Sequence, residues 1–302
     1  MFEVSHYIGN FTSETTLEEK AVQIFTGLDI SESSRKDYAA RIGIFLEYVK
    51  EHKFSKDTFL EFKRYLAQRN DMSISTKAKY LTVGRVFLKE LHRQGIIPVD
   101  ITLNVKSFQQ STRHKRYGVN EDEVNMVKTQ LSGLPDTPQN VRLKTIFTLL
   151  IYQGLRQIEI IRLDVEDLDL TRQTAMILGK GRDDKEPVDL HPQSVLALKN
   201  YMDIARIRSG PLFTSMSNHN KNGRLSTKSL RELVKSTLTQ LNINNTTHGF
   251  RHFFTTKLIA SFSNDLLTVA KFTRHKSIET LQVYNDNLSR QENLPKYYAA
   301  FN

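Results

Sequence analysis

The sequence predicts a mainly α-helical protein of two domains, the second of which carries one small antiparallel β-sheet. The chain has 302 residues, and domains average about 100–200 residues, so the length fits two hydrophobic cores. Most of the apolar residues recur at spacings of three and four, which is the period of a helix that buries one face. A single pair of β-type runs flanks a glycine-rich turn, which predicts one hairpin.

The first predicted domain, residues 33–106, is wholly helical. Helices are expected over residues 33–53, 56–68 and 76–94. Gly95, followed by Pro98, ends the third helix. Residues 1–32 are expected to form an acidic leader, because six acidic residues stand there against one lysine. Residues 107–116 have little apolar periodicity and are predicted to be a basic linker between the domains.

The second predicted domain, residues 117–302, begins with a helix-start signal, in which Asn120 precedes Glu123 by three positions. Strands over residues 174–178 and 187–190 form the predicted hairpin. The other expected helices cover residues 139–153, 157–163, 192–207, 226–241, 248–261, 265–272 and 277–284, with a tail from residue 285.

The composition excludes several classes of protein. The absence of Cys excludes a disulfide framework, a Cys-based zinc site and a thiol nucleophile. The N-terminus lacks the basic start of a secretory signal, and the longest apolar run is much shorter than the roughly 20 residues of a membrane-spanning helix. We therefore expect a cytoplasmic protein. Its net charge of +10 favours a negatively charged partner.

Positive charge is densest over residues 33–116, where 18 Lys and Arg residues stand against 8 Asp and Glu. Taken singly, each of these cations is as well explained by a solvated helix face. Together they favour DNA, because Lys and Arg contacts to phosphates supply most non-specific DNA affinity. The candidate DNA-binding residues are Arg35, Lys36, Arg41, Lys77, Lys79, Arg85, Arg113, Lys115 and Arg116.

Arg156 is the first candidate for chemistry. It follows Gly154 and Leu155 at the predicted start of a helix, where a planar fork of donors and the helix N-terminus both favour a phosphate. A surface arginine paired with Glu159, three positions later, is the plainer alternative.

Four further candidates lie downstream. Lys180 stands in the hairpin turn, and His248 and Arg251 share one helix face at a spacing of three. His275 precedes Tyr284 by nine residues. Each has an ordinary explanation when taken alone: a solvated lysine, a satisfied histidine or a core tyrosine. A metal site is not expected, because His248 lacks nearby Cys or carboxylate ligands.

The order and spacing of these residues resemble the tyrosine recombinase (phage integrase) family. Gly-Leu-Arg-x-x-Glu, a lysine 24 residues after the arginine, a Thr-His-x-x-Arg-His box, and a histidine nine residues before a tyrosine all occur in register. Leu163 and Asp167 also match the family's Leu-x-x-x-Asp. The sequence departs from the family pattern at Arg274, where glycine is frequent, and at Phe253, where Ser or Thr is common.

The resemblance implies a helical core-binding (SAM-like) domain followed by a catalytic domain of the DNA breaking-rejoining fold. It implies that Tyr284 attacks a DNA phosphodiester to leave a 3′-phosphotyrosine, without a metal, ATP or other cofactor. The remaining roles implied by the family fall on five residues. Arg156 and Arg251 would clamp the phosphate, Lys180 would protonate the leaving oxygen, His248 would act as acid or base, and His275 would donate to the phosphate. Glu159 would support this set.

The implied partner is double-stranded DNA with paired inverted half-sites, bound by a homo-tetramer away from any membrane. A resolvase of the Xer type and an integrase of a mobile element remain equally open. An inactive DNA-binding protein of the same fold and a type IB topoisomerase-like enzyme are the alternatives. Tyr297 and Tyr298 are rival nucleophiles, and the tail from residue 285 is expected to dock on either its own domain or a neighbour.

Overall fold

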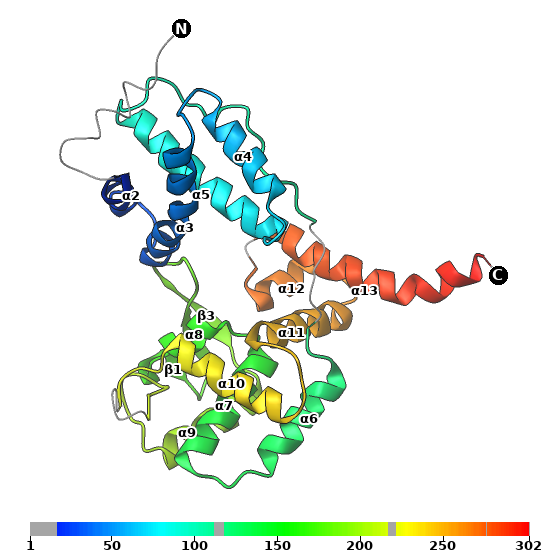
Figure 1. Cartoon of the computed structure of the whole chain (residues 1–302). Coiled ribbons are helices and arrows are strands. Elements are labelled where there is room, and N and C mark those ends of the chain that lie inside the picture. The colour runs from blue at the N-terminus through cyan, green and yellow to red at the C-terminus, as the bar shows by residue number, and fades with distance from the viewer. Residues whose placement is uncertain (1–16, 112–117, 217–221, 276, 302) are drawn as a thin grey trace. The chain divides into compact units, whose positions relative to one another are not determined.

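The computed structural model describes residues 17–111, 118–216, 222–275 and 277–301 (Figure 1). The chain divides into two compact units, residues 1–111 and 112–302. The predicted linker spans this division. Three of its predicted DNA-binding residues, Arg113, Lys115 and Arg116, lie outside the described residues.

The described part of the first unit consists of helices. They are α2 (Leu17–Thr26), α3 (Glu32–Glu51), α4 (Thr58–Gln68) and α5 (Ile74–Arg93). The hydroxyl groups of Ser31 and Ser73 accept hydrogen bonds from the first turns of α3 and α5, which satisfies amide groups that a helix start leaves without partners. The core is aromatic, and the rings of Phe45 and Phe62 meet edge to face with centroids 4.9 Å apart.

Helix α2 was not predicted, because the excess of acidic residues in this segment favoured an acidic leader. Ala21, Ile24 and Phe25 are buried in the same core as α3 and α5. The net negative charge of the segment concealed a short apolar stripe at spacings of three and four. Burial of that stripe adds the helix to the first unit.

The second unit has a three-stranded antiparallel sheet beside its helices. The helices are α6 (Glu121–Ser132), α7 (Pro138–Gln153), α8 (Gln157–Arg162), η1 (Val165–Asp167), α9 (Pro192–Ile204), α10 (Thr227–Gln240), α11 (Thr247–Ser261), α12 (Leu266–Thr273) and α13 (Ile278–Ala299). The strands are β1 (Leu168–Asp169), β2 (Thr174–Leu178) and β3 (Lys185–Asp189), in the order β1-β2-β3. The predicted hairpin is confirmed, whereas β1 was not predicted because two residues carry no periodicity.

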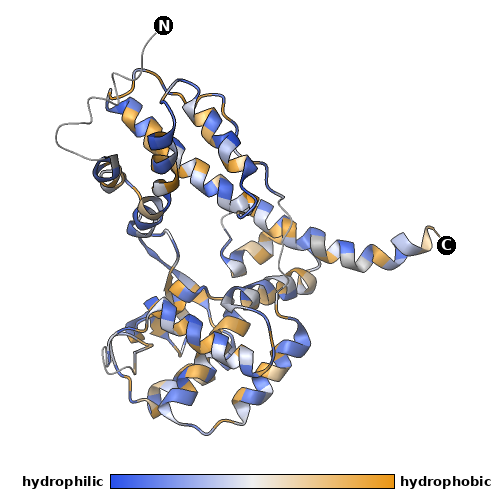
Figure 2. Cartoon of the chain, in the orientation of Figure 1, coloured by the Kyte–Doolittle hydropathy of each residue, from blue (hydrophilic) through white to orange (hydrophobic). Residues whose placement is uncertain are grey.

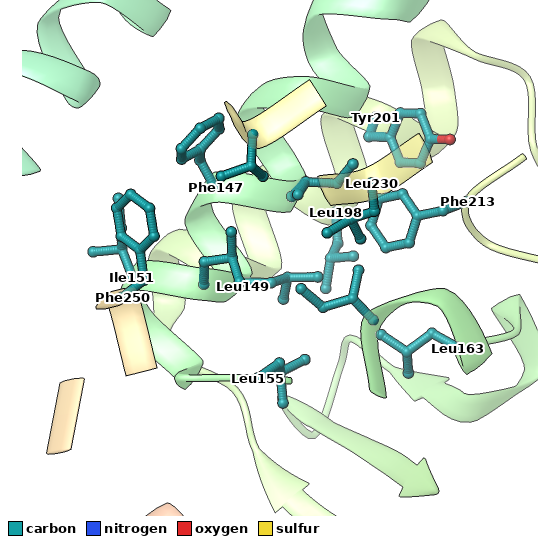
Figure 3. Packing of buried hydrophobic residues seen from close by; sticks show 14 of the residues in the cluster. Phe147, Leu149, Ile151, Leu155, Leu163, Leu198, Tyr201, Phe213, Leu230 and Phe250 are labelled. Atoms are coloured by element: carbon teal, nitrogen blue, oxygen red, sulfur yellow. The ribbon is translucent and has the colours of Figure 1, made fainter. Parts of the chain in front are cut away.

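Helix α7 supplies much of the core of the second unit. Phe147, Leu149 and Leu150 of this helix are almost completely buried, and Figure 3 shows side chains of α7 packing toward those of α9, α10 and α11. Across the same core, Tyr201 stacks on Phe213 with ring centroids 5.4 Å apart. Because both faces of α7 are covered, the helix is a rigid support for the residues that follow its C-terminus.

The tail prediction needs correction. Residue 285 was expected to begin a tail after a short helix, but α13 continues without a break from Ile278 to Ala299, with Pro295 inside it. No glycine interrupts this stretch, and its polar residues are compatible with a helix.

Apolar and polar residues alternate along the helices (Figure 2), and no helix in the described ranges is long and apolar enough to cross a membrane.

Candidate active site

The site begins at the C-terminus of α7. Gly154 ends that helix in the left-handed region, at φ 55°, where glycine avoids the steric cost of a side chain. A Cβ atom at this position would lie 2.3 Å from the ring of Phe254. The carbonyl oxygen of Gly154 accepts a hydrogen bond of 2.7 Å from Arg251. A glycine is therefore needed here for both backbone conformation and close packing.

Arg156 lies at the N-cap of α8 and is tied to Glu159. Its backbone N–H donates to Oε2 of Glu159 at 2.8 Å, and its guanidinium Nη1 donates to Oε1 at 2.7 Å. The Glu159 side chain is 1% exposed, whereas that of Arg156 is 32% exposed. Burial alone would raise the pKa of Glu159, but the charge of Arg274 and the hydrogen bonds from Arg156 outweigh it and lower that pKa.

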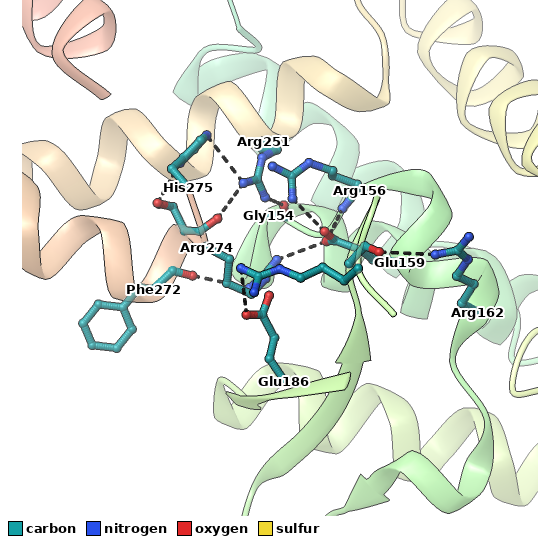
Figure 4. Close-up of polar contacts among 12 residues, drawn as sticks. Gly154, Arg156, Glu159, Arg162, Glu186, Arg251, Phe272, Arg274 and His275 are labelled. Carbon is teal, nitrogen blue, oxygen red and sulfur yellow. Dashed lines mark hydrogen bonds and ion pairs between the residues drawn. The ribbon is translucent and has the colours of Figure 1, made fainter. Parts of the chain in front are cut away.

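Arg251 is a large, fully buried side chain of α11. Besides Gly154, its guanidinium donates to the carbonyl oxygen of Thr273 at 2.5 Å and lies 3.5 Å from Nε2 of His275. Figure 4 shows Arg251 between His275 and Arg156. Burial, followed by the charges of Arg156 and Arg274, lowers the pKa of Arg251 to about 9. The guanidinium thus stays charged at neutral pH and is held by neutral carbonyl groups.

His275 has a defined tautomer. The hydroxyl of Thr273 donates to the carbonyl of Val269 at 2.9 Å, so its oxygen is left to accept from Nδ1 of His275 at 2.7 Å. The proton of a neutral imidazole therefore lies on Nδ1, and Nε2 faces Arg251 as an acceptor. Burial, together with neighbouring cations of which Arg251 is the first, lowers the pKa of His275 to about 3.

Tyr284 comes from α13 and is buried against α11 and α12. Its ring centroid lies 6.1 Å from that of His275 and 4.8 Å from that of His252. Burial raises the pKa of the phenol, while the charges of Arg251 and Arg156 oppose this rise. The tyrosine thus lies beside the same cations that surround the imidazole.

Two predicted residues lie at the edge of this cluster. His248 is exposed near the start of α11, where its ring meets His252 edge to face at 4.7 Å. Lys180 is exposed in the turn between β2 and β3 and makes no hydrogen bond or ion pair with any residue that the structure describes. Its neighbour Gly179 accepts a hydrogen bond of 3.3 Å from Arg162 of α8, which holds the base of the turn near the site.

Sequence reasoning missed two contributors to the cluster. Arg274 donates to Oε2 of Glu159 at 3.2 Å, and its side chain is 5% exposed. His252 contacts the ring of Tyr284. Arg274 departs from the family pattern, but its partner lies 115 residues away in the sequence, so no local pattern could identify the contact.

The candidate DNA-binding residues of the first unit differ widely in their surroundings. Lys77 is buried, and its ammonium group donates to the carbonyl of Ala67 at 2.8 Å. Its charge is therefore used inside the unit, which contradicts the predicted contact with DNA. Arg35 and Arg85 also donate to backbone carbonyls, of Leu28 and Val105. The remaining three are on the surface: Lys36 and Arg41 pair with Glu32 and Asp37, and Lys79 is exposed.

The cluster carries more positive than negative charge. The guanidinium groups of Arg156 and Arg274 donate to the buried carboxylate of Glu159, and the nearby guanidinium of Arg251 donates to backbone carbonyls instead (Figure 4). Bringing like charges together in a buried place is unfavourable unless an anion compensates them. The arrangement is therefore suited to a phosphate group beside Tyr284. Within the described residues, no group of three or more His, Asp or Glu side chains could hold a metal ion.

Comparisons with known proteins agree with this geometry. The chain is 29% identical over 235 residues to the tyrosine recombinase XerC of Neisseria gonorrhoeae, covering 76% of this chain and 74% of the relative. It is 24% identical over 281 residues to XerD of Lacticaseibacillus casei, covering 89% and 92%.

Solved structures share the fold. XerH recombinase bound to its palindromic difH substrate, in a post-cleavage complex, matches with a TM-score of 0.75 at 17% identity, covering 97% of this chain and 89% of that one. A lambda integrase dimer bound to a COC′ core site matches with a TM-score of 0.68 at 11% identity, covering 93% and 94%. The predicted fold class is confirmed. The model of the phage integrase family matches residues 119–291, more than half of the chain, and the chain belongs to this family of tyrosine recombinases of Xer-like type.

Proposed function

We propose that the protein is a site-specific recombinase that cuts and rejoins DNA through Tyr284. The observation that carries this proposal is the convergence of the phenol of Tyr284 and the imidazole of His275 on the guanidinium groups of Arg251 and Arg156. Arg156 caps α8, Arg251 lies within α11, His275 follows α12 and Tyr284 lies within α13, so four separate elements supply these residues. A tyrosine that only packs in a core does not require guanidinium groups beside it. A phenol that attacks a phosphodiester does require them, because they stabilise the charge of the transition state.

The reaction conserves the phosphodiester bond energy. The phenolic oxygen of Tyr284 loses its proton and forms a bond to phosphorus, while the bond from phosphorus to the 5′-oxygen breaks. The product is a 3′-phosphotyrosine and a free 5′-hydroxyl, and a second 5′-hydroxyl reverses these steps on another strand. Energy is retained in the new ester, so no high-energy co-substrate enters the balance.

Arg156 and Arg251 are the proposed clamps on the non-bridging oxygens. Arg251 is preorganised, because two backbone carbonyls and the protein core fix its guanidinium. Arg156 is the more exposed of the two and is aimed by Glu159. Fixed donors stabilise the charge that develops in the transition state without having to reorganise as it forms.

Proton transfers are assigned to Lys180, His248 and His275. Lys180 is the proposed acid for the leaving 5′-oxygen, because the hairpin turn can approach DNA beside α8. His248 is the proposed acid or base for the phenolic proton. The Nε2 atom of His275 accepts in the absence of DNA, and a bound phosphate would favour its protonated form, which then donates to the phosphate.

Trapping with a nicked suicide substrate tests the nucleophile. The wild-type protein should become covalently attached to the DNA, and Tyr284→Phe should not, because only the phenolic oxygen is missing. Tyr297→Phe and Tyr298→Phe serve as matched controls that should retain attachment. Covalent attachment of the Tyr284→Phe variant to DNA would show that another residue is the nucleophile.

An inactive accessory protein and a topoisomerase-like enzyme are not favoured. The relatives named above are tyrosine recombinases, and the complete set of candidate catalytic residues is present in this chain. Relaxation of a supercoiled plasmid without a recombination site would distinguish a topoisomerase-like enzyme from a recombinase. We expect no relaxation of such a plasmid.

Recombination on paired inverted half-sites, carried out in the cytoplasm by four copies of the chain, is the proposed setting. Each copy offers one Tyr284 for one strand, so exchange between two duplexes requires four copies. Tyr297, Tyr298 and Phe301 near the end of α13 are exposed and offer an apolar contact for a second copy. Mass measurement of the DNA complex should show fewer copies after alanine replaces all three.

A further inference from the structure

Arg274 occupies an unfavourable backbone position. It follows α12 with φ 56° and ψ 38°, in the left-handed region, where a residue with a Cβ is disfavoured and glycine is not. Its backbone N–H closes α12 on the carbonyl of Ala270 at 2.9 Å, which any residue but proline would do. The backbone therefore gives no reason for an arginine, and the reason must lie in the side chain.

The side chain of Arg274 is used inside the active site. Its Nη2 atom donates to Oε2 of Glu159 at 3.2 Å, and Nη1 lies 3.4 Å from the carbonyl oxygen of Phe272. The Nε atom is buried without a hydrogen-bond partner. Such a charge is costly to bury, so its pairing with Glu159 is the contact that offsets the cost.

The contact between Arg274 and Glu159 limits which oxygens of Glu159 the Arg156 guanidinium can bind. A free carboxylate can accept two parallel hydrogen bonds from one guanidinium. Here Oε2 is already shared by the backbone N–H of Arg156 and by Arg274, so the guanidinium of Arg156 reaches only Oε1. Among the described residues, this is the only hydrogen bond that the Arg156 guanidinium makes, and its remaining donors stay available for a phosphate.

We propose that Arg274 is a positioning residue for strand cleavage: by occupying one oxygen of Glu159, it keeps the outer edge of the Arg156 guanidinium free for the scissile phosphate. The inference rests on the proposed function of Arg156 as a phosphate clamp. Without Arg274, both oxygens of Glu159 would draw the Arg156 fork inward, and the carboxylate would lose its second cation. The substrate contact would then weaken in the transition state.

Three substitutions separate charge from backbone fit. Arg274→Gly and Arg274→Asn suit the left-handed conformation but remove the charge, whereas Arg274→Lys keeps the charge in the same strained backbone. We expect single-turnover cleavage of a suicide substrate at saturating DNA to fall about 10-fold or more in the Gly and Asn variants, because a misplaced phosphate clamp slows the chemical step. The Lys variant should recover part of the rate. A Gly variant at the wild-type rate, or a Lys variant as slow as Gly, would overturn the inference.

The route through Glu159 is tested by a double-mutant cycle. In a Glu159→Gln background, Arg274→Gly should slow cleavage by much less than in the wild type, because the two changes remove the same contact. Equal losses in both backgrounds would show that Arg274 acts by another route and would overturn the proposal.

A measurement without DNA distinguishes this inference from the proposed function. Glu159 is faced by Arg156 from α8, Arg274 from the end of α12 and Arg251 from α11. Removing Arg274 should therefore shift the midpoint of acid unfolding to higher pH in the Gly and Asn variants, with recovery in Lys. An unchanged midpoint would overturn the role of Arg274, whereas failure of the wild type to form any covalent DNA complex would overturn the proposed function instead.

Discussion

Surface cations of the first unit and the buried arginines of the active-site cluster in the second unit are held in opposite ways. In the first unit, surface cations such as Lys36 pair with a neighbouring acid one helical turn away, and both side chains remain in solvent. In the second unit, Arg251 and Arg274 are buried and meet residues distant in the sequence. Exposed pairs contribute little free energy, whereas buried charges are costly unless they are compensated. Density of charge along a sequence therefore indicates a partner, whereas a cluster of buried like charges indicates a reactive site.

Loss of Arg156 should have the largest effect. Arg156→Ala removes a donor that acts on the transition state, so the cleavage rate should fall by about 10²–10³, or roughly 3–4 kcal/mol. Single-turnover kinetics on a suicide substrate measure this. Arg69→Ala is the matched control from the first unit, since its ion pair with Asp71 lies on the surface, and the cleavage rate should hardly change. A variant of Arg156 that kept over half of its rate would contradict the clamp.

Two glycines with positive φ, Gly95 in the first unit and Gly154 in the second, allow the two units to be compared by the free energy of unfolding. Gly154→Ala strains the backbone and drives a methyl group into Phe254, so we expect a loss of about 2–4 kcal/mol in the free energy of unfolding. Gly95 has φ 71° but open space around it, so Gly95→Ala should cost only about 1 kcal/mol. Chemical denaturation measures both. Equal losses would mean that the close approach to Phe254 relaxes at no cost.

His275 predicts a pH dependence of stability for the second unit. Its pKa in the folded protein, about 3, lies below the ordinary value, so the unfolded chain binds the proton more readily. This contribution to stability is complete above the ordinary pKa of about 6.5 and is lost as the pH falls toward 3. Because the imidazole is partly solvated, we expect a loss of only about 1 kcal/mol between pH 7 and pH 5. Denaturation of His275→Gln should show a smaller loss, and an identical loss would contradict the burial of a neutral imidazole.

The smallest effects are expected on the surface of the first unit. Lys79→Gln should weaken DNA binding only slightly and lower the slope of log affinity against log salt concentration by about 1, as expected for one phosphate contact. Lys199→Gln on α9 is the control, since Lys199 is exposed but was not predicted to meet DNA. Binding titrations over a range of salt measure the slopes. Equal slopes for both variants and the wild type would remove Lys79 from the interface.

The sequence alone determined the helical class and the hairpin, because periodicity and caps are local, and the candidate catalytic residues followed from the resemblance of their order and spacing to a known family. The Asn120 and Glu123 capping box is one such case, with both of its hydrogen bonds present. Local information did not reveal α2, whose few apolar residues lie among acids, or the continuation of α13 beyond Tyr284. Only the tertiary structure decided that Lys77 is buried and that Arg274 reaches Glu159. Those outcomes depend on which side chains meet across a core, and the free energy of a buried charge is set by neighbours that are remote along the chain.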